Sequence, residues 1–129
     1  MQFEGIYTPL VTPYHDDFSL NDSALVDTVE LLIGAGVHGI IVAGTTGEYY
    51  AQSTKERIEM MSRVKGLING RVPMIVGTGA MRTEDSIIFA KAAKDIKADA
   101  LLVATPPYTY PTGREIALHA LAIDAKGTA

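Results

Sequence analysis

The chain has 129 residues, of which 47% are hydrophobic and 20% charged, a composition typical of one globular domain with a packed core. Its formal net charge is −4 and its basic residues are dispersed along the chain. This excludes the concentrated positive charge that nucleic-acid-binding proteins carry, so we expect no nucleic-acid partner.

The sequence contains no cysteine, which excludes disulfides, thiolate catalysis and cysteine-based metal sites and fits a cytoplasmic location. The first residues lack the basic and apolar regions of a secretory signal. No apolar run approaches the roughly 18 residues that span a bilayer, so we expect no membrane partner.

Four short apolar runs have the length and composition of parallel strands that are buried on both faces. In chain order they are residues 5–12, 37–43, 72–77 and 98–105. Each is followed by a segment in which apolar residues recur with helical spacing. The sequence therefore predicts four units, each of one strand and one helix.

The starts of the four predicted helices are indicated by capping residues. The first helix begins at Asn21 or Asp22 and ends at Gly34, and the third begins at Thr83. The second and fourth begin with capping boxes, in which a hydroxyl and a glutamate three residues later cap each other's backbone N–H groups. These boxes are Ser53 with Glu56 and Thr112 with Glu115.

Strand and helix alternate at a pitch of roughly 30 residues, as in right-handed βαβ units. This predicts the α/β class with a parallel sheet, and residues 1–129 as one unit. Two architectures use this unit, a doubly wound sheet and the first half of an eight-stranded (β/α)8 barrel. In both, function lies on the loops after the carboxyl ends of the strands.

These loops are rich in hydroxyl groups and glycines and contain neither lysine nor histidine. They offer neutral hydrogen-bond donors, which suit a carboxylate or carbonyl oxygen better than a triphosphate. The predicted loops are residues 12–14, 44–48, 77–79 and 105–111.

The loop Gly44-Thr45-Thr46-Gly47-Glu48 is the strongest candidate for an anion site. Its glycines would let the backbone turn tightly, so that the amides and hydroxyls of Thr45 and Thr46 point at one anionic group. The alternative is a simple turn in which the hydroxyls bond to the local backbone. Glu48 is expected to bind loop amides rather than to act as a base.

The sequence indicates neither a cofactor nor a metal. Residues 34–39 match the dinucleotide fingerprint G-x-G-x-x-G, but they end a helix and open a strand, the reverse of the required order. The three histidines lack the spacing of metal ligands. All six lysines are expected to lie exposed on the surface.

Taken together, the motifs resemble those of the dihydrodipicolinate synthase and N-acetylneuraminate lyase family of class I aldolases. The resemblance runs from about Gly5 to about Asp124. Its most specific parts are Gly5-Ile6 through Thr12-Pro13, residues 39–48, Glu56-Arg57, residues 73–79 and Thr105-Pro106-Pro107-Tyr108. It implies the barrel rather than the doubly wound sheet, with this sequence supplying the first four of eight units.

The resemblance also implies a chemistry. Family members form a Schiff base between pyruvate, or a related 2-keto acid, and a lysine on the sixth strand. Thr45 and Thr46 would bind the keto-acid carboxylate, with Gly47 and Tyr49 completing the substrate-binding set. Thr45 and Tyr108 would act in a catalytic hydroxyl relay, with Tyr108 near the dimer interface of a homo-oligomer.

The same comparison implies what this sequence lacks and where it differs. The sequence matches neither the sixth-strand lysine nor a relay tyrosine on the fifth strand, so we expect the 129 residues alone to be inactive. Tyr49, Thr109 and Tyr110 depart from the dihydrodipicolinate synthase pattern towards the distal end of the substrate. A keto-deoxy sugar-acid aldolase or dehydratase is therefore an alternative. A non-catalytic fragment that assembles with itself or with a complementary half is another.

Overall fold

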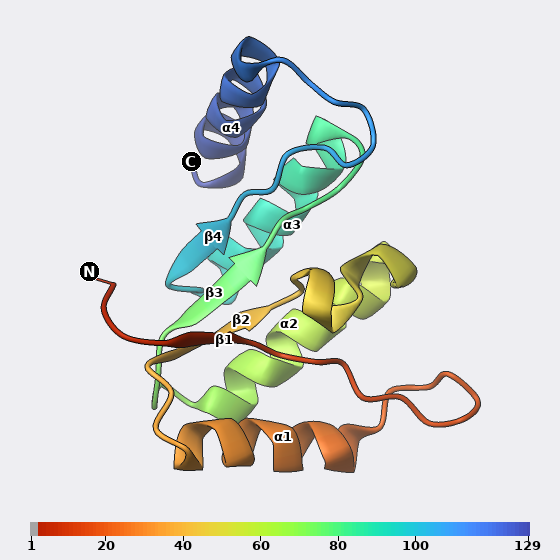
Figure 1. Ribbon diagram of the computed structural model, residues 1–129, viewed down its shortest axis with the longest axis vertical. Helices are drawn as coiled ribbons and strands as arrows, with labels where there is room; N and C mark the ends of the chain where they lie inside the picture. Colours follow the sequence, from red (N-terminus) through yellow and green to blue (C-terminus); the bar gives the residue numbers. More distant parts are fainter. Residues whose placement is uncertain (1–2) are drawn as a thin grey trace.

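The computed structural model describes residues 3–129 and contains four alternating strands and helices, with two short 3-10 helices after the second strand. Figure 1 shows their arrangement. In chain order the elements are β1 (Tyr7–Pro9), α1 (Asp22–Gly34), β2 (Gly39–Val42), η1 (Thr45–Gly47), η2 (Tyr49–Ala51), α2 (Thr54–Ile68), β3 (Met74–Gly77), α3 (Thr83–Asp95), β4 (Ala100–Leu102) and α4 (Gly113–Gly127).

The sheet is parallel, and its strand order is β1-β2-β3-β4. Its register is set by pairs such as Thr8 with Ile40 and Val76 with Leu101. All four predicted strands are present, but each is shorter than the apolar run that predicted it. An apolar run shows only which residues are hydrophobic, whereas a strand extends only over residues that pair with a neighbouring strand. Val103, for example, belongs to the fourth run but lies beyond the last pair of β4.

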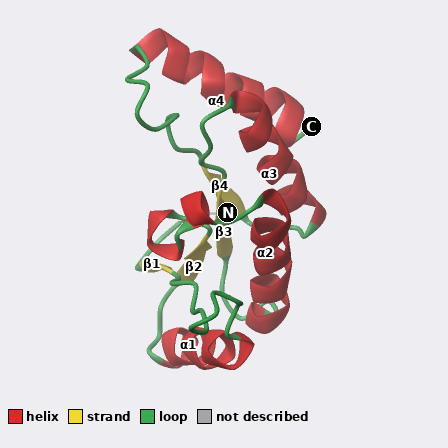
Figure 2. Ribbon diagram, turned by 90° about the vertical axis from the view of Figure 1, so that its right-hand side faces the viewer, coloured by secondary structure: helices red, strands yellow, loops and turns green. Residues whose placement is uncertain are grey.

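The helices follow one another around one face of the sheet. Figure 2 shows α1, α2, α3 and α4 forming an arc on this side of the strands. Ile40, Val42, Met74 and Val76 are fully buried in the core cluster with residues of α1, α2 and α3. This is the arrangement of the first half of a (β/α)8 barrel, in which helices cover only the outer face, and it confirms the predicted fold class.

Local capping fixes the starts of α1, α2 and α4 as predicted, whereas α3 begins at Thr83 without a side-chain capping hydrogen bond from Arg82, the residue before it. Asn21 caps α1 by accepting the N–H of Ala24 at 3.0 Å. Both predicted capping boxes form, at α2 and at α4. The hydrogen bonds that Ser53 donates hold the pKa of the Glu56 carboxyl below its usual value, so this cap is ionised at neutral pH.

The most unusual buried side chain is Arg57 of α2, which is 2% exposed. Its guanidinium donates one hydrogen bond to the carbonyl of Gly77 and another to that of Gly79, both at 2.6 Å. The ring of Phe89 lies 3.8 Å from the guanidinium carbon, close enough for a cation–π contact. Burial lowers the pKa of Arg57 to about 10, so the group remains charged at neutral pH.

Replacing Arg57 is therefore expected to destabilise the chain strongly. Arg57→Met keeps most of the volume but removes two charge-assisted hydrogen bonds from buried carbonyl groups. Since each such bond is worth about 1.5–3 kcal/mol, we expect a loss of about 3 kcal/mol or more in the free energy of unfolding. Urea unfolding followed by circular dichroism at one fixed protein concentration measures it.

Arg63→Met is the matched control on the same helix, because Arg63 forms an exposed ion pair with Asp22. Exposed pairs contribute less than about 1 kcal/mol. Equal destabilisation by the two substitutions would show that the buried contacts of Arg57 contribute nothing beyond an ordinary surface pair.

Candidate functional site

The loops after β1 and β2 are joined by side-chain hydrogen bonds at the carboxyl edge of the sheet. The hydroxyl of Thr12 donates to the carbonyl of Gly47 at 2.7 Å. The amide of Gln52 donates to Thr12 at 3.3 Å, to the Tyr14 hydroxyl at 2.9 Å and to the Gly47 carbonyl at 3.4 Å. The role of Gln52 was not predicted from the sequence, because Thr12 and Tyr14 lie about 40 residues before it.

The backbone of the 44–48 loop turns by a route that differs from the predicted one. Gly44 has an ordinary negative φ, and the left-handed conformations fall on Ala43 and Glu48, both at φ 57°. Gly47 is required for close approach instead, because a Cβ there would lie 2.9 Å from the carbonyl oxygen of Leu10. Gly77 is equally constrained, since its Cβ would lie 2.3 Å from the carbonyl oxygen of Ala43.

Thr45 and Thr46 form the start of η1 and are exposed at this edge. Within residues 3–129, neither hydroxyl has a hydrogen-bond partner. The simple-turn alternative required these hydroxyls to bond to the local backbone, and the structure does not contain those bonds. Both hydroxyls are therefore available to an external acceptor.

Glu48 differs from expectation. Its carboxylate is exposed and makes no hydrogen bond within the described part of the chain, so the prediction that it binds loop amides is wrong. Its backbone N–H instead closes η1 by donating to the carbonyl of Thr45 at 3.0 Å. The left-handed backbone at Glu48 turns the chain from η1 into η2.

Tyr49 lies beneath the loop, against the buried arginine. The Arg57 guanidinium carbon is 4.7 Å from the centre of the Tyr49 ring. The same ring contacts Gly79, where a Cβ would lie 3.0 Å from it. Arg57 thus contacts the loops that follow β2 and β3 at once. A substrate-binding role for Tyr49 stays a prediction, as do those of Thr45, Thr46 and Gly47.

Tyr108 belongs to a separate loop, between β4 and α4. It is 93% exposed and has a left-handed φ of 70°. Figure 1 shows this loop running away from the loop after β2. Within residues 3–129, no hydrogen bond joins Tyr108 to Thr45, so a relay between them stays a prediction.

The lysines lie away from this edge, on α2, α3 and α4 or just before β4. Five are exposed as predicted, whereas Lys65 is half-buried and pairs with Asp99 at 3.6 Å. The prediction that Lys65 is exposed was wrong, because its partner Asp99 lies far along the chain and the sequence does not show that the two meet. Over the described residues, no cluster of three metal-ligating side chains forms, and no helix is long and apolar enough to cross a membrane.

Comparisons with known proteins agree with this geometry. The 4-hydroxy-tetrahydrodipicolinate synthase of Cellvibrio japonicus is 40% identical over 90% of this chain, which covers 40% of that protein. The same enzyme of Salinibacter ruber is 38% identical over 100% of this chain and 43% of its own length. Among solved structures, the chain is similar to the chloride-inhibited dihydrodipicolinate synthase of Acinetobacter baumannii, complexed with pyruvate. The two are 36% identical and superpose with a TM-score of 0.93. The match covers 97% of this chain and 43% of that one.

The chain thus spans about two fifths of the length of the curated relatives that it matches. Its half-barrel arrangement agrees with that share, because the structural match is close over nearly the whole chain. The match to the family itself covers residues 2–128. The chain belongs to the dihydrodipicolinate synthetase family.

Proposed function

We propose that this chain forms part of a Schiff-base-forming lyase that acts on pyruvate or a related 2-keto acid. The observation that carries the proposal is the pair of exposed, unpartnered threonine hydroxyls at the carboxyl edge of the sheet. The relatives named as 4-hydroxy-tetrahydrodipicolinate synthases and the pyruvate complex of the Acinetobacter baumannii enzyme support it.

The proposed site binds the keto acid by its carboxylate. Hydroxyl groups of Thr45 and Thr46 donate to the two carboxylate oxygens, and neutral donors of this kind suit a single negative charge. Arg57 does not neutralise the substrate, because its guanidinium is turned towards Gly77, Gly79 and Phe89. The loop therefore selects by hydrogen bonding rather than by an exposed cation.

Imine formation needs an unprotonated amine beside the keto carbon. None of the six lysines lies on the loops at the carboxyl edge. The amine, and the fifth-strand tyrosine of the relay, are thus expected from outside residues 3–129. Tyr108 is proposed to act in a relay with the Thr45 of a neighbouring copy, because its loop projects away from its own threonines. A cytoplasmic location and a cofactor-free reaction belong to the same proposal.

Thr45→Val tests the carboxylate site, because it removes one donor and keeps the volume. We expect pyruvate to shift the amide resonances of Thr45, Thr46 and Gly47 in the unmodified chain, and the Kd for pyruvate to rise about ten-fold or more in the variant. A hydrogen bond to a charged group is worth about 1.5–3 kcal/mol, which corresponds to such a factor. Two-dimensional NMR titration with pyruvate measures both quantities.

Thr54→Val is the matched control, since Thr54 is exposed at the start of α2 and outside the loop. Its Kd should equal that of the unmodified chain. Acetone, which has the keto group without the carboxylate, should cause no shift at Thr45. An unchanged Kd in Thr45→Val would mean that the threonine loop is only a turn.

Reductive trapping tests the imine chemistry. The 129-residue chain, incubated with pyruvate and then borohydride, should gain no stoichiometric adduct by mass spectrometry. Imine formation needs an amine that is shielded from water beside the keto carbon, whereas five of the six lysines are exposed and Lys65 pairs with Asp99. A longer protein that includes the sixth-strand lysine should gain one adduct. A stoichiometric adduct mapped to one of these six lysines would show that this chain carries its own activated amine.

A further inference from the structure

Gln52 lies between η2 and α2, and its amide nitrogen is near three acceptors from the loops after β1 and β2. The distances are 2.9 Å to the Tyr14 hydroxyl, 3.3 Å to the Thr12 hydroxyl and 3.4 Å to the Gly47 carbonyl. An amide nitrogen carries only two hydrogens, so these three acceptors share two donors. The side chain therefore joins the two loops without giving each partner a full hydrogen bond.

The oxygen of the same amide has no partner. Oε1 of Gln52 is buried and accepts no hydrogen bond within residues 3–129. A buried acceptor of this kind lowers the stability of a fold. The reversed orientation of the amide would place Oε1 against the carbonyl oxygen of Gly47, and neither oxygen can donate. The observed orientation thus keeps a donor towards Gly47 and leaves the amide oxygen unpaired.

A second route from Gln52 to the same carbonyl passes through Thr12. The Thr12 hydroxyl accepts from Gln52 at 3.3 Å and donates to the carbonyl of Gly47 at 2.7 Å. Hydrogen bonds in such a chain polarise one another, so the first strengthens the second. Gln52 therefore acts on the carbonyl of Gly47 both directly and through Thr12.

The carbonyl of Gly47 lies at the end of the turn that carries the two threonines. In this turn, η1, the N–H of Gly47 donates to the carbonyl of Gly44, and the N–H of Glu48 donates to that of Thr45, both at 3.0 Å. The turn contains only three residues, Thr45–Gly47. A displacement of Gly47 therefore also moves both threonines.

We propose that Gln52 is a positioning residue for the carboxylate of the keto acid. It fixes the carbonyl of Gly47, and the turn that ends there holds the hydroxyls of Thr45 and Thr46 side by side. The proposal rests on the proposed function of these threonines. An apolar side chain in place of Gln52 would remove the unpaired oxygen, so the glutamine serves the position of the loop rather than the stability of the fold.

Gln52→Met tests this role, because methionine has nearly the length and shape of glutamine but lacks the amide. The side chain lines a pocket of about 760 Å³ between residues 12–22 and α2, so methionine should not crowd its neighbours. We expect the Kd of the 129-residue chain for pyruvate to rise about five-fold, which corresponds to the loss of one ordinary hydrogen bond. The midpoint of urea unfolding should stay equal or rise, because a buried unpaired oxygen is removed. Two-dimensional NMR titration and circular dichroism measure the two quantities.

Hydrogen exchange measures the position of the loop without any ligand. The amides of Gly47 and Glu48 close η1, and we expect both to exchange at least about three-fold faster in Gln52→Met. The amide of Arg57, which donates to Ser53 within α2, should keep its rate. If the unmodified chain does not bind pyruvate, the proposed function is contradicted, and the exchange rates still decide the role of Gln52.

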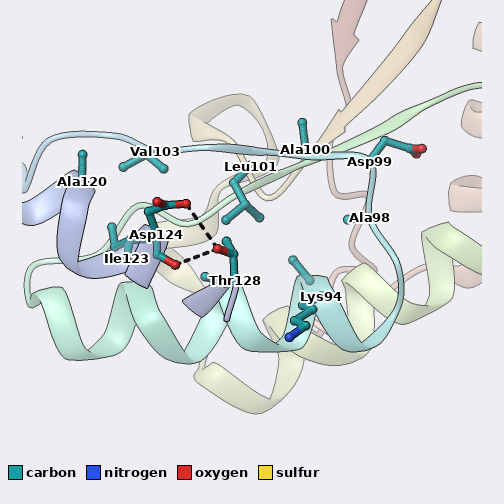
Figure 3. A pocket seen from close by; sticks show the side chains of 12 residues that line it. Lys94, Ala98, Asp99, Ala100, Leu101, Val103, Ala120, Ile123, Asp124 and Thr128 are labelled. Carbon is teal, nitrogen blue, oxygen red and sulfur yellow. Dashed lines mark hydrogen bonds between the residues drawn. The ribbon is translucent and has the colours of Figure 1, made fainter. Parts of the chain in front are cut away.

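Thr12→Val interrupts the second route and should raise the Kd by a similar factor. In the double variant with Gln52→Met, the increase should be smaller than the product of the two single increases, because both act on one carbonyl. Thr128→Val is the matched control. Its hydroxyl donates to the Asp124 carbonyl at 2.6 Å, in the pocket between β4 and α4 that Figure 3 shows. The Kd of this control should equal that of the unmodified chain.

The proposal requires both a higher Kd and faster exchange in η1. In a chain that binds pyruvate, an unchanged Kd in Gln52→Met would overturn it, as would unchanged exchange of the Gly47 and Glu48 amides. A lower urea midpoint with faster exchange throughout the chain would also overturn it, because Gln52 would then support the whole fold.

Discussion

A buried guanidinium joins the parts of this structure that surround the proposed site. Arg57 projects from α2 and binds the carbonyl groups of Gly77 and Gly79 in the turn after β3. The rings of Phe89 and Tyr49 lie over it, from α3 and from the loop after β2. Four segments between residues 49 and 89 therefore contact one charged group, and any movement of these loops changes its environment.

This arrangement explains how the loop keeps its position although the hydroxyls of Thr45 and Thr46 make no hydrogen bond within residues 3–129. Tyr49 is held by Arg57, and the carbonyl of Gly47 is held by Thr12 and Gln52. The loop is thus fixed by the carbonyl of Gly47 and by Tyr49, which follows it. The hydroxyls of Thr45 and Thr46 are therefore not needed to hold it in place. Because these other contacts fix the loop, its unpaired hydroxyl donors can stay in one position without hydrogen bonds of their own.

The features that the sequence predicted correctly depend on neighbouring residues. The Asn21 cap and both capping boxes involve residues three positions apart, and the strands follow from continuous apolar runs. The features that it missed join distant residues: Gln52 with Thr12, Lys65 with Asp99, and Arg57 with Gly79. Gly47 was predicted for a partly wrong reason. It was expected from the sequence to let the backbone turn, whereas the structure requires a glycine there because the chain passes close to the carbonyl of Leu10.

The site and the sheet edges depend on different contacts. Every partner of Arg57 and Gln52 lies between β1 and α3, so the threonine loop is positioned within one chain. The edges of β1 and β4 have no such internal partners among the described residues, and their apolar groups remain exposed. The position of the threonine loop therefore depends on contacts within residues 3–129, whereas the apolar inner face of the sheet is only partly covered by these residues. The loops are held at this edge by Arg57 of α2 and Phe89 of α3, whose contacts all lie within the described residues.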